Sequence, residues 1–242
     1  MAEDEIRKHA NAAIKIVKDK ETDWKHKLKD ISLEVLIIVF AVTISIWFHN
    51  WSDKLQERKE EKIFLSGFRK DLLGDIDNIK ASLDFYENSY AGMHYFAKVG
   101  AGDSLSNDSL NKYASICFSS TTLDPHISRY EALKSSGKLG IIENTDLLNN
   151  IIDLNESTLA RIKLLNDLNL KFIEKTSDYI QLNARLSPKG TMTNAQTILR
   201  TSQWRFLMMF GQSGLLLNVI PAHKDGLKKC HALITEIDRE LE

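Results

Sequence analysis

Two aspartates one helical turn apart are the side chains of this sequence best placed for chemistry. Asp71 and Asp75 are four residues apart, so on a helix their carboxylates share one face, with Asp77 close by. Paired carboxylates can transfer protons or hold a hard cation. The alternative is a solvent-exposed face whose charge Arg69 and Lys70 balance. We favour the exposed face and expect no catalytic or metal-binding role for it.

The other candidates are isolated residues. His223 and His231 are eight residues apart, whereas metal sites on one helix favour a spacing of four, so we expect both to be surface histidines. Ser136 precedes Gly137 without a Gly-x-Ser-x-Gly pattern, and the glycine is better explained as the left-handed end of a helix. Phosphate-loop, dinucleotide, zinc and His-Glu-x-x-His signatures are absent. The sequence predicts no catalytic residue, no cofactor and no metal, and therefore a protein that is not an enzyme.

A membrane anchor is the most informative element. Residues 31–51, ISLEVLIIVFAVTISIWFHNW, reach roughly 31 Å at about 1.5 Å per residue, close to the ~30 Å hydrocarbon core. Leu33 and Phe40 belong to the apolar part, and Trp47 and Trp51 suit the membrane interface. The bulky, charged residues that follow do not form a signal-peptide cleavage site. We predict one transmembrane helix over 31–51, an uncleaved signal anchor.

Glu34 lies inside this anchor and has two interpretations. An ionisable residue at membrane depth is a candidate for binding a membrane partner. Glu34 is also only a turn from the interface, where it can reach headgroup water beside Lys29 or Asp30. Both interpretations stay open.

Charge on either side of the anchor sets the predicted orientation. Five lysines precede it within about 15 residues, and four basic residues follow it, which favours a cytoplasmic N-terminus. We expect a cytoplasmic tail at 1–30 and an extracytoplasmic domain at 52–242. Residues 5–29 have amphipathic spacing, so the tail is either a helix on the inner membrane surface or a solvated segment.

Long helices dominate the predicted domain, because the chain has only 3 prolines and 11 glycines and shows no alternating strand pattern. Two apolar stripes recur with a period near 3.5 residues, which is typical of helices packed on one another. The first comprises Leu65, Phe68, Leu72, Ile76, Ile79, Leu83, Tyr86, Tyr90 and Met93. The second comprises Ile151, Leu154, Thr158, Ile162, Leu165, Leu168, Phe172, Thr176, Tyr179 and Leu182. We predict an all-α fold, in which the transmembrane helix continues into an elongated antiparallel helical bundle.

Shorter elements complete this prediction. We expect a helix over 109–118, a helical turn over 130–134, and a helix capped by Asn144 or Thr145. A further helix covers 194–210, and a last stripe runs over 227–241. The apolar run from Trp204 to Ile220 is interrupted by polar residues and glycines, so we expect it to be buried core rather than a second membrane span.

Net charge and cysteine content exclude some functions. The net charge of −1 gives no support for a nucleic-acid partner. Cys117 and Cys230 are too few and too far apart for a metal site or redox pair. They form either one disulfide or two unpaired buried thiols.

Four segments of the chain resemble an uncharacterised family of single-pass membrane proteins of Bacteroidetes, known only as a domain of unknown function. The anchor ends in Ile46, Trp47, Asn50 and Trp51, and a charged stretch follows. The helix after it carries Phe64, Leu65, Phe68, Asp71, Leu72 and Asp75. Further on stand Tyr130, Leu133, Lys134, Ser136, Gly137 and Leu139. The resemblance covers 33 to about 179 and implies a protein of the bacterial cytoplasmic (inner) membrane with no known activity. With the orientation predicted from charge, the domain would lie in the periplasm.

That lineage gives one further expectation. Asp103-Ser104-Leu105 and Asp108-Ser109-Leu110 look like its short signal for periplasmic O-glycosylation.

Two functions from different classes follow. We prefer a membrane-anchored structural or accessory protein whose bundle docks on another envelope protein or on itself. The first stripe is then either the interface inside the bundle or the interface with the partner. The alternative is a periplasmic sensor or ligand-binding domain that holds a small molecule between helices and signals through a membrane partner.

Overall fold

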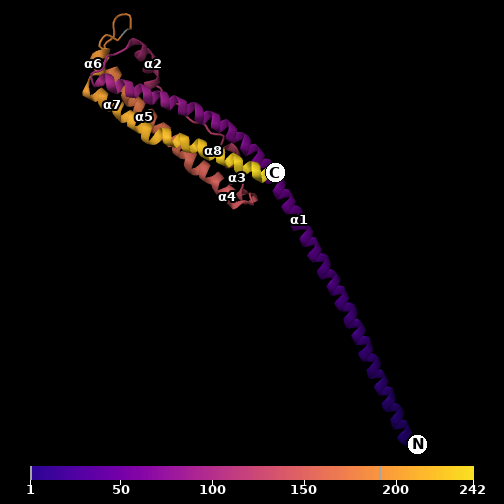
Figure 1. Cartoon of the computed structure of the whole chain (residues 1–242). Helices are drawn as coiled ribbons and strands as arrows, with labels where there is room; N and C mark the ends of the chain where they lie inside the picture. Colours follow the sequence, from indigo (N-terminus) through magenta and orange to yellow (C-terminus); the bar gives the residue numbers. More distant parts are fainter. Residues whose placement is uncertain (1, 191) are drawn as a thin grey trace. The chain divides into compact units, whose positions relative to one another are not determined.

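Every regular element that the structure describes is a helix, which confirms the predicted all-α class (Figure 1). The computed structural model describes the backbone of residues 2–190 and 192–242; the side chains of residues 1–28, 30, 107, 111, 116, 117 and 191 lie outside the description. The α-helices are α1 (Ala2–Gly100), α2 (Asn107–Cys117), α3 (Ser128–Ser135), α4 (Thr145–Ile152), α5 (Ala160–Asn183), α6 (Ala195–Leu199), α7 (Ser202–Gly214) and α8 (Ile220–Leu241). A 3₁₀-helix η1 (Leu139–Ile141) and two π-helices, η2 (Asp153–Leu159) and η3 (Leu215–Val219), complete the set.

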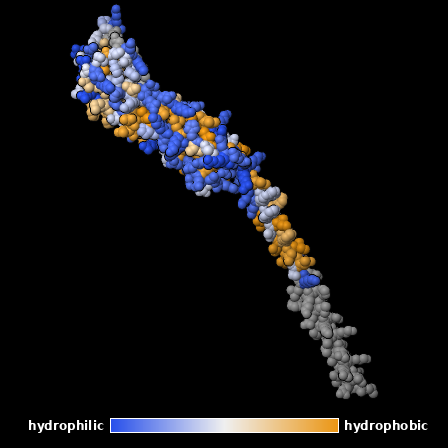
Figure 2. Space-filling view, in the orientation of Figure 1, coloured by the Kyte–Doolittle hydropathy of each residue, from blue (hydrophilic) through white to orange (hydrophobic). Residues whose placement is uncertain are grey.

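The chain divides into two compact units, Met1–Lys59 and Glu60–Glu242, and α1 belongs to both. In the first unit, residues 31–51 form an exposed, continuous hydrophobic stretch of α1 (Figure 2). Thr43 and Ser45 donate their hydroxyls to the carbonyls of Val39 and Ala41, at 2.7 and 2.8 Å. Such bonds within one helix satisfy the side-chain hydroxyls without a partner from another segment. The predicted amphipathic character of residues 5–29 lies outside the described side chains.

Two helices are long and apolar enough to cross a membrane. The apolar window of α1 is 0% buried inside the protein, whereas the window in Ser202–Leu241 is 39% buried. Met208, Leu215, Val219 and Ile220 are among the buried residues of this segment. The prediction that 204–220 is buried core is therefore right for one face only, because Phe206 and neighbouring apolar side chains are exposed.

Two apolar cores lie along the second unit. The first gathers residues of α1, α4, η2, α5 and α8, among them Leu65, Phe68, Leu72, Ile76, Ile79, Leu147, Ile151, Leu154, Ile162, Cys230, Leu233 and Ile237. The second gathers Tyr86, Met93, Phe96, Val99, Ile173, Tyr179, Trp204, Met208, Leu215 and Val219. Most of the first stripe is therefore buried within its own chain, while Leu83 and Tyr90 are half-buried.

Local sequence explains where several helices begin and end. Asn144 caps α4, since its Oδ1 accepts the amide of Leu147 at 3.1 Å, and this confirms the predicted cap. Thr201 caps α7 in the same way, accepting the amide of Trp204. Gly137 has φ of 70° just after α3, the predicted left-handed conformation.

The second stripe departs from its prediction in the middle of α5. Leu168 is 51% exposed and Leu182 is 84% exposed, whereas Asn166 and Ile173 are buried. The predicted stripe assumed a strict 3.5-residue period, and a straight helix drifts from that period by about 20° per heptad. Asn166 turns inward because its side chain has a hydrogen-bond partner there, and Leu168 lines a surface groove described below.

Candidate functional site

The predicted carboxylate pair connects α1 to the segment before and within α3. Asp75 is only 3% exposed, and its Oδ1 accepts the backbone N–H of His126 at 2.9 Å and lies 2.7 Å from His126 Nδ1. Asp71 Oδ2 accepts a hydrogen bond from Arg129 Nε at 2.8 Å. The predicted exposed face is thus wrong for Asp75, and Arg69 pairs with Asp238 of α8 rather than with either aspartate. The two carboxylates hold chain segments together and have their own protein partners.

Glycines on the same face of α1 allow this approach. A Cβ at Gly67 would come within 2.4 Å of the guanidinium of Arg129, and one at Gly74 within 2.9 Å of the ring of His126. The hydrogen bond to the Asp75 side chain raises the pKa of His126, and burial opposes that rise. Both positions are glycine because a larger residue would clash with the side chain of Arg129 or His126 that packs there.

A buried polar centre lies where α1, α5 and α8 meet. Tyr86 donates its hydroxyl to the Thr121 carbonyl or to Asn166 Oδ1, each at 3.0 Å, and its ring centroid lies 5.2 Å from that of His223. His223 is fully buried, so its predicted surface position is wrong, whereas His231 is exposed. His223 Nδ1 lies 2.8 Å from the carbonyl of Val219, which assigns the proton to Nδ1.

Electrostatics keep this centre neutral. Burial lowers the pKa of His223, opposed by the hydrogen bond to the Val219 carbonyl, and burial is also the main cause that raises the pKa of Tyr86 to about 12. Among the described protein groups, Asn166 Nδ2 and His223 Nε2 have no hydrogen-bond partner. The unpaired Asn166 Nδ2 can donate a hydrogen bond, and the unpaired Nε2 of neutral His223 can accept one. The centre fixes the packing of three helices but presents no nucleophile activated by a base.

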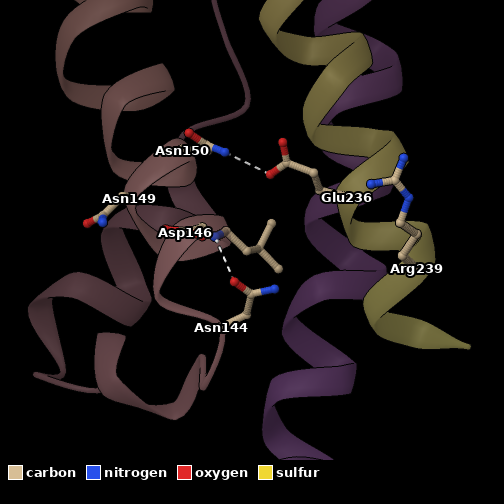
Figure 3. Close-up of a pocket in the computed structure, with 7 residues that line it drawn as sticks. Asn144, Asp146, Asn149, Asn150, Glu236 and Arg239 are labelled. Atoms are coloured by element: carbon tan, nitrogen blue, oxygen red, sulfur yellow. Dashed lines mark hydrogen bonds between the residues drawn. The ribbon is translucent and has the colours of Figure 1, made fainter.

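A shallow polar pocket of about 500 Å³ lies between α4 and α8 (Figure 3). Asn150 Nδ2 donates to Glu236 Oε2 at 2.8 Å, and Asn144 Nδ2 donates to Glu240 Oε2 at 2.9 Å. Asp146 and Arg239 complete the polar lining. Because these amides and carboxylates bind one another across the pocket, we assign it no ligand.

A larger apolar groove of about 620 Å³ lies between α5 and the α7–η3 segment. Its walls are Leu165, Leu168, Asn169, Lys171, Phe172 and Lys175 of α5, and Phe206, Leu207, Phe210, Gly211, Gly214, Leu215, Asn218 and Val219 of α7 and η3. Gly211 keeps the two helices close, since a Cβ there would meet the ring of Phe172 at 2.5 Å. We call this feature the α5–α7 groove.

Exposed apolar side chains surround the α5–α7 groove. They are Leu164 and Leu168 of α5 and Phe206, Met209, Phe210, Leu216 and Leu217 of α7 and η3. Figure 2 shows hydrophobic residues at the surface over this part of the molecule. Exposed apolar surface that continues over two neighbouring helices marks a binding surface more often than scattered single residues do.

Sequence reasoning did not find this groove. Phe206 and Phe210 lie on the opposite side of α7 from the buried Trp204 and Met208, so this helix is apolar on more than one side. The apolar residues on more than one side of α7 were the sequence signal for an exposed apolar surface, because a helix in contact with water is normally polar on one face.

The other predicted residues have the following places. Leu33, Glu34, Phe40, Trp47 and Trp51 are exposed on α1, and the rings of Trp47 and Trp51 stack with centroids 6.4 Å apart. Cys230 is a buried free thiol whose pKa burial raises to about 12, and Cys117 lies outside the described side chains. Asp103, Ser104 and Asp108 are exposed near α2. Among the residues described, no group of three His, Cys, Asp or Glu side chains is placed to hold a metal.

No family model, curated protein or solved structure matches this chain. The class that the structure defines is an all-helical protein with one long apolar helix segment near its N-terminus. The resemblance to the Bacteroidetes membrane family stays a prediction.

Proposed function

We propose that this protein is a non-enzymatic binding protein of a bacterial inner membrane, anchored by residues 31–51. Its second unit is an antiparallel helical bundle in the periplasm that holds an apolar molecule in the α5–α7 groove. The observation that carries the proposal is the groove itself, about 620 Å³ in volume, half of whose lining residues are leucine or phenylalanine. Small-molecule sites are typically apolar clefts of about 300–1,000 Å³.

Membrane anchoring is supported by the exposed segment of α1 over 31–51. Burying its apolar side chains in lipid is favourable by about 25 cal/mol per Å² of surface removed from water. Within the protein these side chains are not buried. The lysines before the segment support a cytoplasmic N-terminus.

Ligand binding is better supported than docking through the first stripe. Leu65, Leu72, Ile79 and Tyr86 pack inside their own chain and offer no surface to a partner. The groove, by contrast, is accessible from outside. A protein that co-purifies through the groove is therefore an outcome of the experiment below rather than the favoured function.

The test is native mass spectrometry of the full-length protein extracted from its own membranes. Gly214 lines the groove with φ of −60°, and a Cβ there meets no heavy atom within 4 Å, so Gly214→Phe fills the groove without straining the backbone. Gly140 has equally open space far from the groove and provides the control Gly140→Phe. We expect a bound small molecule on the natural protein and on Gly140→Phe, and none on Gly214→Phe.

Two other results would refute the proposal. A ligand-free natural protein whose protein partner is lost only with Gly214→Phe would establish docking instead. A ligand retained by Gly214→Phe would place binding elsewhere.

Topology has its own test. A reporter that is active only outside the cytoplasm should be active when fused after Glu242. Activity of a cytoplasm-only reporter at that junction would reverse the orientation, and release of the protein by alkaline carbonate would exclude the anchor.

A further inference from the structure

We propose that the molecule held in the α5–α7 groove is a free fatty acid, bound with its carboxylate at Lys171 and Lys175. This inference rests on the proposed function and names the ligand of the same site. It follows from how charge and apolar surface are distributed along the groove.

The direction of the groove is fixed by contacts between α5 and the α7–η3–α8 segment. Tyr179 stacks on Trp204 with ring centroids 6.0 Å apart, and the rings of Phe172 and Phe210 are 6.1 Å apart. Farther along, Gly226 of α8 faces Ile162. The helices are therefore antiparallel, and low numbers of α5 lie beside high numbers of α7 and η3.

This register separates a charged end from an apolar end. Lys171 and Lys175 are one turn apart on α5 and line the groove at the level of Phe206 and Phe210. Leu165 lines the other end beside Leu215, Asn218 and Val219 of η3, so this end carries no charged side chain. A ligand with one charged end and one apolar tail matches this polarity.

The charge at the first end selects an anion. Lys171 and Lys175 are the only charged residues in the lining, and no carboxylate is among the lining residues. Both lysines are exposed, and neither forms an ion pair with a described residue within 4 Å. Asp167, Glu174 and Asp178 lie within about one turn of these lysines on α5, but none of them lines the groove. An anion inside this end of the groove therefore meets two lysines and no lining carboxylate.

The chemistry of the lining favours a carboxylate on an unbranched chain. Lysine binds carboxylates and phosphates alike as a point charge, and no arginine lines the groove, so the choice of headgroup depends on the other polar residues of the lining. The only other polar lining residues are Asn169 and Asn218, which leaves few partners for a hydroxyl-rich headgroup. The leucine and phenylalanine walls suit an alkyl chain.

The test uses the full-length protein in nanodiscs of phosphatidylcholine and a photoactivatable palmitic acid analogue that carries a diazirine on its chain. We expect labelled peptides from α5 and α7, and protection by excess palmitate. Methyl palmitate has the same chain without the charge and should protect about tenfold less well. Lys171→Glu with Lys175→Glu should weaken labelling about tenfold, whereas Lys163→Glu, exposed on α5 outside the groove, should not.

The outcomes separate this inference from the proposed function. Equal protection by methyl palmitate overturns the fatty acid and leaves an uncharged apolar ligand in the groove, and equal protection by lysophosphatidylcholine overturns it in favour of another lipid with one acyl chain. Labelling that Gly214→Phe does not reduce overturns both. Circular dichroism melting of each variant identifies any loss of labelling caused by unfolding. If Gly214→Phe does not fold, Leu168→Trp replaces it, because it narrows the groove from α5 at an exposed site.

Discussion

Replacing Asp75 by alanine should destabilise the second unit, although the sequence pattern places this residue on an exposed helix face. The substitution removes the acceptor of two hydrogen bonds from His126, at 2.9 Å from the backbone nitrogen and 2.7 Å from Nδ1. Hydrogen bonds to a charged group contribute about 1.5–3 kcal/mol when they are shielded from water. The bond to the His126 ring contributes less, about 0.5–1 kcal/mol, because that side chain is half-exposed and screened by solvent. Removing the buried carboxylate also removes its desolvation cost, so we expect a net loss of about 2–3 kcal/mol.

Urea unfolding of residues 60–242, followed by circular dichroism, measures this loss. Asp77→Ala is the matched control, because Asp77 is exposed on the same helix two residues away, and its cost should stay within about 0.5 kcal/mol. A double-mutant cycle with His126→Ala isolates the side-chain bond, since the backbone N–H of His126 survives in that variant.

The pH dependence gives an independent check. Asp75 raises the pKa of His126 in the folded state above its unfolded value of 6.5. The coupling in the cycle should therefore be fully present below pH 6.5 and should decrease as pH rises through the folded pKa. An Asp75→Ala cost equal to that of Asp77→Ala, or a coupling that increases with pH, would refute the role assigned to this carboxylate.

Three further predictions concern the same unit. Leu72→Ala should lower the free energy of unfolding in urea by about 2–5 kcal/mol because Leu72 is buried in the core. Leu168→Ala should lower it by under about 1 kcal/mol because Leu168 is half-exposed, and equal losses would contradict the exposed position of Leu168 in the groove. His223 has a folded pKa below its unfolded value of 6.5, so stability should fall as pH decreases below 6.5, and a His223→Gln variant that keeps this loss would assign it to another group. Asn144→Ala should cost about 1 kcal/mol through loss of the α4 cap, while Asn149→Ala on the same helix should not, as thermal melting would measure.

Several helices were predictable from sequence, although the helix predicted over 194–210 is divided into α6 (Ala195–Leu199) and α7 (Ser202–Gly214). Asn144 was predicted as a cap because its side chain competes well for an exposed amide, and Gly137 as a helix end because it adopts positive φ without a Cβ penalty. The first stripe was predictable because its buried positions are apolar with few exceptions. These features depend on residues close together in the chain.

The direction that polar residues face was not predictable in the same way. Asp75, Asn166 and His223 are buried because each finds a partner on a distant or adjacent segment, respectively His126, Tyr86 and the carbonyl of Val219. A pattern that places polar residues outside and apolar residues inside therefore failed at Asp75 and at His223. It failed in the opposite sense at Leu168, which is exposed.

By itself, the sequence determined the helical class, the apolar segment at 31–51 and the ends of several helices, because hydrophobic period, capping residues and glycine act over a few neighbouring residues. Only the tertiary structure decided that the first stripe is internal and that α5 and α7 enclose a groove with two lysines at one end. The physical reason is that packing joins segments far apart in the chain, as in the Arg69–Asp238 pair with its separation of 169 residues. No local pattern specifies which faces meet when the chain folds, and the proposed binding function depends on those faces.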